Sequence, residues 1–190
     1  MSLGWWIFAA LAAVVAVYVI LVFNRLVRQR NVVREGWSGI DVQLKRRTDL
    51  IPNLVETVKA YASHERSLFE EITARRAASV AASDVSGQAN AERALSGSLG
   101  KLMAVAEAYP ELKANQNFLE LQKELADIED HIQMARRYYN GAVRNLNISI
   151  QSFPDVIVAR SLGFGEQPFF ELDSRAEAAA PQIGFSGGRE

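Results

Sequence analysis

The sequence predicts an all-α protein in which an N-terminal transmembrane helix precedes an antiparallel bundle of long helices with coiled-coil-like packing. Residues 3–23 carry no charged side chain, and apolar residues recur every three or four positions through most of the remaining chain. No alternating polar and apolar run suggests a strand. The 190 residues suffice for one compact domain beside the membrane segment. We therefore expect an anchor at 1–24, a helical bundle domain at 25–170 and a weakly ordered tail at 171–190.

The apolar segment has the length of a membrane span. About 20 residues, rising 1.5 Å each, cross a hydrocarbon core of roughly 30 Å. Met1 to Gly4 contains no Lys or Arg, which favours a retained anchor over a cleaved signal peptide. Basic side chains follow the span and none precedes it, so we expect the N-terminus outside and the domain in the cytoplasm. The aromatic and basic residues expected at the membrane interfaces are Trp5, Trp6, Tyr18, Phe23, Arg25, Arg28 and Arg30.

The first helix is expected to leave the membrane without interruption and to run toward Leu50. Pro52 must then kink or restart it, because proline lacks the backbone N–H that a helix interior requires. A second helix is expected to carry one apolar face from Leu54 to near Ala82.

The remaining helices are delimited by a turn and a proline. Turn-forming and capping residues cluster at Ser83–Gly87, where we expect a loop. A third helix follows to Tyr109, and Pro110 is expected to end it and to connect it to an antiparallel fourth helix, with their seams buried against each other. The fourth helix carries a coiled-coil-like seam: Phe118, Leu121, Leu125, Ile128, Ile132, Ala135, Tyr139, Val143, Leu146, Ile150 and Phe153.

The sequence lacks the residue patterns of the common active sites considered below. The chain has no cysteine, so thiolate chemistry is excluded, and its net charge of -1 gives no general attraction to nucleic acid. Neither His64 nor His131 has the glutamate three residues earlier that carboxylate-bridged metal bundles need. Ser96–Lys101 lacks the first glycine of a phosphate-binding loop. We expect no enzyme, no catalytic or metal-binding residues, no cofactor and no nucleic acid partner.

Charged residues form one notable cluster, at Lys45, Arg46 and Arg47. On a continuous helix this cluster lies roughly 30 Å beyond the span, out of reach of lipid headgroups. An internal polar network is favoured, with a partner's acidic surface as the alternative and nucleic acid as the weakest option. The residues expected in such a network or partner contact are Asp41, Lys45, Arg46, Arg47, Asp49, Arg136 and Arg137, and Glu65 is a further candidate partner.

The apolar stripes predict a homo-oligomer. The seam of the fourth helix extends over about 35 residues, or roughly 50 Å, while the third helix has little more than half that length, so part of the seam needs another cover. Small residues four apart in the span also favour close helix association in lipid. The expected contact residues are Ala9, Ala13, Leu146, Ile150, Phe164, Phe169 and Phe170.

Several motifs together resemble those of the LemA family of bacterial membrane proteins. They are Arg30-Asn31, Trp37, Ile40–Arg47, Asp49–Val55, His64-Glu65, Glu107–Asn115, Arg136–Asn140 and Ser152–Pro154. The resemblance implies a single N-terminal span in the bacterial cytoplasmic membrane, a helical bundle and no established enzymatic activity. A similar domain occurs in a protein involved in forming magnetosome membranes, which by analogy suggests membrane organisation.

These observations favour a membrane-anchored helical scaffold that contacts the lipid bilayer and acts through homo-oligomerisation and protein partners. The alternative hypothesis is a regulatory adaptor that presents its basic cluster to a membrane enzyme or signalling protein. A scaffold should assemble alone in detergent, whereas an adaptor should stay small until its client is added.

Overall fold

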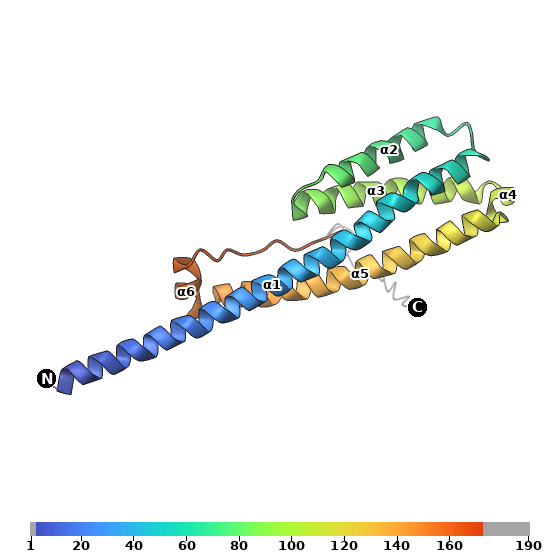
Figure 1. The fold of residues 1–190 in the computed structure, drawn as a ribbon. Helices are drawn as coiled ribbons and strands as arrows, with labels where there is room; N and C mark the ends of the chain where they lie inside the picture. The colour runs from blue at the N-terminus through green and yellow to red at the C-terminus, as the bar shows by residue number, and fades with distance from the viewer. Residues whose placement is uncertain (1–2, 173–190) are drawn as a thin grey trace, which may run out of the picture.

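The computed structural model describes residues 3–172, and these form the all-helical architecture that the sequence predicts (Figure 1). The tail expected at 171–190 lies outside the described residues from position 173 onward. The helices, in chain order, are α1 (Leu3–Lys59), α2 (Arg66–Ala81), α3 (Val85–Glu107), α4 (Pro110–Lys113), α5 (Gln116–Gln151) and α6 (Asp155–Ser161).

Helix α1 is a single helix of 57 residues, about 85 Å long at 1.5 Å per residue. Its N-terminal part projects alone, and its C-terminal part lies among the other helices (Figure 1). Of the two alternatives predicted at Pro52, the restart is wrong, because the helix continues to Lys59. The kink stays a prediction. The missing N–H of Pro52 would leave the carbonyl of Thr48 unpaired, but Arg76 Nε of α2 donates to that carbonyl at 2.6 Å.

Helices α2 and α3 form a hairpin. Because α1 runs to Lys59, Leu54 belongs to α1, and α2 begins later than predicted, at Arg66. The predicted turn is confirmed, although it is shorter than expected. Asp84 caps α3, its side chain accepting a hydrogen bond from Gly87 N at 2.8 Å.

Helix α5 runs antiparallel to α1 and packs mainly on it, while α3 packs mainly on α2 (Figure 1). Pro110 opens only the single turn α4, and Asn115 then caps α5 through Phe118 N at 3.1 Å. The prediction that the third and fourth helices, α3 and α5, bury their seams mainly against each other is therefore wrong, because α1 covers most of the α5 seam. The seam is buried or half-buried as far as Ile150, whereas Phe153 is 81% exposed.

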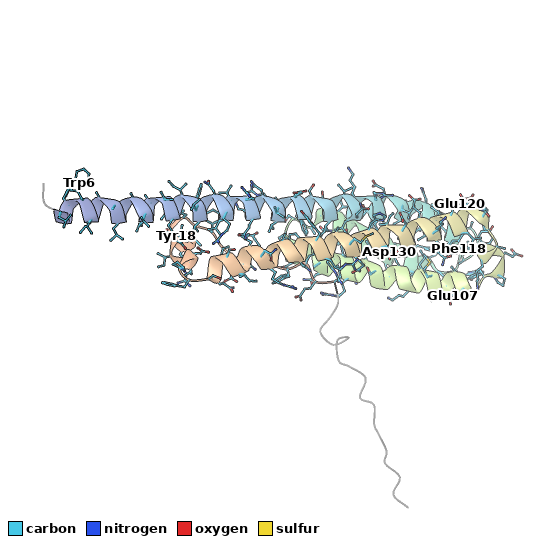
Figure 2. All side chains as sticks on the ribbon, turned by 90° about the horizontal axis from the view of Figure 1, so that it is seen from below. Trp6, Tyr18, Glu107, Phe118, Glu120 and Asp130 are labelled. Atoms are coloured by element: carbon cyan, nitrogen blue, oxygen red, sulfur yellow. The ribbon has the colours of Figure 1, made fainter. Side chains whose placement is uncertain are left out.

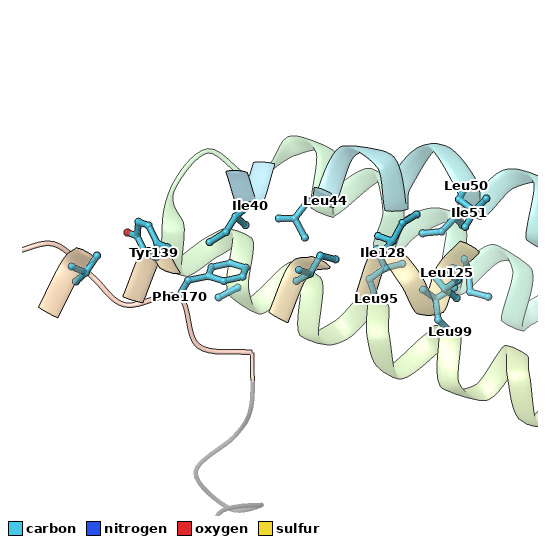
Figure 3. Packing of buried hydrophobic residues seen from close by; sticks show 14 of the residues in the cluster. Ile40, Leu44, Leu50, Ile51, Leu95, Leu99, Leu125, Ile128, Tyr139 and Phe170 are labelled. Carbon is cyan, nitrogen blue, oxygen red and sulfur yellow. The ribbon is translucent and has the colours of Figure 1, made fainter. Parts of the chain in front are cut away.

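The core lies where α1, α3 and α5 meet, as Figure 3 shows for ten labelled residues: Ile40, Leu44, Leu50, Ile51, Leu95, Leu99, Leu125, Ile128, Tyr139 and Phe170. Gly36 lets α1 and α5 approach closely, because a Cβ atom there would lie 3.0 Å from Tyr139 Cα. Trp37 follows and packs edge-on against the rings of Tyr139 and Phe170, with ring centroids 5.5 and 5.6 Å away.

Candidate functional site

Arg47 is the centre of a buried network, and its own contacts join α1 to α3 and α5. Its side chain is only 2% exposed. Nη1 donates to Glu92 Oε2 of α3 at 2.9 Å. Nη2 lies 2.8 Å from Ser96 Oγ and 2.6 Å from Glu129 Oε1 of α5. The structure thus places Arg47 in an internal network whose acidic partners are Glu92 and Glu129, in place of the expected Asp41, Asp49 or Glu65.

The two carboxylates of this network occupy different environments. Glu92 is fully buried and also accepts hydrogen bonds from Ser79 of α2 and, at 3.0 Å, from Gln88 Nε2. Burial raises the pKa of Glu129 above its ordinary value, the Arg47 guanidinium opposes that rise, and the Glu92 carboxylate adds to it. All the bonds of this network lie within one chain. Those of Arg47 and of Ser79 join different helices, and together they fix α1 against α2, α3 and α5.

The rest of the basic cluster faces outward. Lys45 and Arg46 are exposed, as are Asp41 and Asp49. Lys45, Asp41 and Asp49 border an open cleft of about 310 Å³ between α1 and the α2–α3 hairpin, and Arg46 does not line it. Its charged or amide-bearing lining residues are Asp41, Lys45, Asp49, Arg76 and Gln88.

The chemistry of this cleft suits binding. Alternating carboxylate and ammonium groups can pair with both charges of a partner surface, and exposed Val80 adds an apolar contact. Within residues 3–172, no group of three or more His, Cys, Asp or Glu side chains could hold a metal ion. Arg136 and Arg137 lie elsewhere, on α5, where Arg136 is half-buried and Arg137 is exposed.

A second polar site lies at the other end of the bundle, where α6 meets α1. Asp155, the first residue of α6, accepts a hydrogen bond from Tyr18 and forms an ion pair with Arg25. Phe164 packs edge-on against Phe23 at 6.0 Å, and the guanidinium carbon of Arg30 lies 5.1 Å from the centre of the Phe164 ring. These four expected anchor residues therefore contact the C-terminal part of the chain.

The other expected anchor residues are exposed. Arg28 lies on the surface of α1, and Trp5 and Trp6 lie on the part of α1 that projects alone. Figure 2 shows Trp6 at the free end of α1 and Tyr18 beside α6. Tyr18 thus marks the point on α1 where contact with the remainder of the chain begins.

A segment without helix or strand, residues 164–172, returns from α6 along α5, and we call it the C-terminal strap. Two asparagines of α5 hold it by paired amide bonds. Asn147 exchanges two hydrogen bonds of 2.9 Å with the backbone of Gln167. Asn140 does the same with Phe170, at 2.9 and 3.0 Å.

The expected oligomer contacts are placed differently from the prediction. Leu146, Ile150, Phe164 and Phe170 are buried within the chain, whereas Phe169 is 40% exposed and Ala9 and Ala13 are exposed. The inference that the α5 seam needs a second copy as cover is wrong, because α1 extends alongside it and covers it. Homo-oligomerisation itself stays a prediction.

Several residues of these sites were missed by sequence reasoning. Glu92 carried a signal, since it stands three and seven residues before Leu95 and Leu99 and so shares the apolar face of α3. A carboxylate on such a face needs a buried cationic partner. Asp155 gave no comparable signal, because its contact with Tyr18 spans 137 residues.

The fold and these sites define a helical-bundle protein whose long first helix is apolar enough to cross a membrane. The chain belongs to the LemA family, whose family model matches residues 36–185. The resemblance recognised in the sequence motifs is thereby confirmed.

Three relatives share 26% identity with this chain. Magnetosome protein MamQ of Magnetospirillum gryphiswaldense aligns over 174 residues. Magnetosome protein MamQ 2 of Paramagnetospirillum magneticum aligns over 175. Both alignments cover 78% of this chain and 64% of the magnetosome protein, so the chain matches less than two thirds of either relative's length. Protein LemA of Metamycoplasma hominis aligns over 149 residues, which cover 78% of this chain and 68% of the relative. Together with α1, these relatives support a membrane-associated protein.

Proposed function

We propose that this chain is a membrane-anchored helical scaffold of the bacterial cytoplasmic membrane, which holds a protein-binding cleft at a fixed distance from the bilayer. The observation that carries the proposal is the continuity of α1, which extends from the apolar segment into the core of the bundle. Lys45, which lines the cleft, stands 22 positions after Phe23 at the end of the span, a separation of about 33 Å along the helix.

The bundle supports α1 along that distance. Helix α5 packs antiparallel against it, and polar side-chain contacts occur near both ends of this helix pair. Asp155 binds Tyr18 and Arg25 near the membrane, while Asn115 Nδ2 donates to Tyr61 Oη at 3.0 Å at the far end. The Arg47 network lies between them. Movement of the span and of the cleft should therefore be coupled.

The proposed orientation has the N-terminus outside and the bundle in the cytoplasm. It is supported by Arg25, Arg28 and Arg30, which follow the apolar segment directly. A cysteine introduced at Ser2 should react with a membrane-impermeant thiol reagent in intact cells, and a cysteine at Ser86 should not. The opposite labelling pattern would refute this orientation.

Self-association is proposed to occur through the projecting part of α1, since the bundle covers its own seam. Ala9, Ala12, Ala13 and Ala16 lie on one face of that helix and are exposed. Assembly of parallel copies in the membrane plane would form an array of clefts. The relatives named as magnetosome proteins favour a role of this kind in membrane organisation.

The mass of the full chain in nanodiscs tests the scaffold directly. Assemblies larger than one chain are expected, and an A9L/A13L variant should shift them to the monomer, because leucines there prevent close helix approach. A10L is the matched control, since Ala10 lies about 100° around the helix from Ala9. A wild-type protein of monomer mass over micromolar concentrations would refute self-association.

The regulatory adaptor remains the second candidate, favoured by the exposure of Lys45 in the cleft and of its neighbour Arg46 on the surface of α1. Affinity purification of the full chain from native membranes distinguishes the two. An adaptor should be monomeric alone and should lose its client, a membrane enzyme or signalling protein, when both residues are changed to glutamate. A scaffold should keep its self-assembly in the same variant.

A further inference from the structure

The part of α1 that stands clear of the other helices is too short to cross a bilayer. Side chains from Leu3 to Val17 are exposed, Tyr18 and Val19 are half-buried, and Val22 is buried. The 15 exposed residues extend over roughly 22 Å, whereas a hydrocarbon core measures roughly 30 Å. The uncharged sequence continues to Asn24, so the hydrocarbon should reach the level at which other parts of the chain cover α1.

The covering element at that level is α6. Figure 1 shows α6 lying across α1 at the end of α5, with α1 continuing alone beyond it. The contact between Asp155 and both Tyr18 and Arg25 fixes this position. Val158 and Ala159 of α6 are buried. Helix α6 and the turn that precedes it therefore lie beside the last apolar turns of the span.

Large apolar side chains are exposed at this same end. Phe153, in the turn between α5 and α6, is 81% exposed, the highest value among the exposed large apolar side chains of residues 3–172. Ile157 of α6 is 62% exposed. Together with exposed Ile148 and Leu162 they lie within 15 residues of sequence, and we call these four residues the α6 patch. Their exposure to water would be unfavourable.

From this geometry we infer that the α6 patch is a second membrane contact, inserted into the interfacial layer of the same bilayer that α1 crosses. The lipid surface is favoured as the occupant because the patch adjoins the span and lies where the free length of α1 ends. Arg28 and Arg160 are exposed near this level and can meet lipid phosphates, as the basic residues of interfacial helices do. The inference rests on the proposed membrane span.

Two contacts with one bilayer would do what a single helix cannot. A lone span can tilt and rotate, whereas a second contact beside it restricts both motions. Because α6 lies at one end of the span, beside Tyr18 and Arg25, its insertion would also displace lipids in one leaflet only. The patch would thus orient the cleft relative to the membrane surface.

Nitroxide labelling of the full chain in liposomes of phosphatidylethanolamine and phosphatidylglycerol tests this inference. The chain has no native cysteine, so single cysteines at Phe153 and Ile157 can be labelled cleanly. Labels there should collide more with oxygen, which enters the bilayer, than with a water-soluble nickel chelate. Val80, exposed on α2, is the matched aqueous control and should show the reverse preference.

A label at Val14 separates this inference from the anchor on which it depends. If the Val14 label is in the bilayer but the Phe153 and Ile157 labels behave like the Val80 label, the second contact is refuted and the anchor is retained. If the Val14 label is itself in water, the proposed span fails. Labels at Phe153 that are shielded from both probes, with broadening that disappears on dilution with unlabelled chains, would show a second copy on the patch and would also overturn the lipid contact.

A photoreactive lipid provides a measurement on the unmodified chain. Adducts are expected in the peptide spanning residues 148–162 as well as in the α1 span. Adducts confined to residues 3–23 would overturn the inference.

Discussion

At the scale of single residues, Arg47 shows how a buried charge can organise helices. One guanidinium faces two carboxylates, from Glu92 and Glu129, while Lys45 and Arg46 beside it remain in water. Within this run of three basic residues, Arg47 holds helices together and Lys45 and Arg46 face solvent, and the run's own sequence does not show which residue has which role. The outcome depends on where Glu92 and Glu129, 45 and 82 positions away, meet the helix.

Replacing Arg47 by methionine should lower the free energy of unfolding by about 3–5 kcal/mol, because a buried carboxylate would lose its cation. Denaturant unfolding of the full chain in detergent, followed by circular dichroism, measures this loss. The triple variant R47M/E92Q/E129Q should recover most of it, since both carboxylates are then neutral. A triple variant less stable than R47M would contradict the account.

The raised pKa of Glu129 predicts a specific pH dependence. A carboxyl group that keeps its proton longer in the folded state makes the unfolding free energy fall as pH rises from the ordinary value of 4.5 through the folded pKa. E129Q should remove this slope. Glu71 is the control, because hydrogen bonds from Lys101 and Ser98 lower its pKa. E71Q should change the slope below pH 4.5 instead, and an unchanged slope above pH 4.5 in E129Q would contradict the assignment.

At the scale of helices, the sequence predicts the number and approximate position of the long helices well, because apolar spacing is a local property. The failure at Pro52 is instructive. Proline removes one hydrogen bond, and only a distant residue can replace it for the orphan carbonyl. That residue, Arg76, belongs to another helix, so local pattern could not foresee that α1 would continue.

Arg76 and Pro52 should therefore be energetically coupled. R76M should cost about 1–3 kcal/mol of stability, since it leaves the Thr48 carbonyl unsatisfied. In a P52A background the same change should cost much less, because the alanine N–H can bond that carbonyl. Thermal unfolding of the four proteins completes the cycle. Equal costs in both backgrounds would show that Arg76 does not compensate for the proline.

Gly36 and Gly39 stand before and after Trp37 in the sequence and form a matched pair for substitution. G36A should destabilise the protein by about 1–3 kcal/mol, because its Cβ would press on the backbone of Tyr139. G39A meets no atom within 4 Å and should stabilise the helix by about 0.5–1 kcal/mol. Chemical unfolding of both variants decides the point. Two variants of equal stability would mean that α1 and α5 do not approach closely at Gly36.

At the scale of the whole molecule, the apolar segment, the all-α class and the seam of α5 follow from sequence, but the pairing of helices does not. The seam specifies that residues such as Leu146 and Ile150 are covered, not which helix covers them. We expected a second copy to cover the seam. Helix α1 covers it instead, because it is long enough to lie alongside both α5 and the α2–α3 hairpin. The same length makes it both membrane span and bundle core.

The central claim is that one unbroken helix links the membrane segment to the cleft. A distance measurement by pulsed electron resonance tests it, with nitroxides at Val14 and Val42, which are both exposed on α1. The full chain would be placed in nanodiscs and diluted with unlabelled chain to suppress contacts between copies. An unbroken α1 predicts a narrow distribution centred at about 42 Å, the length of 28 helical residues. A broad distribution, or one centred well below that distance, would show that α1 bends or breaks between membrane and cleft and would contradict the account.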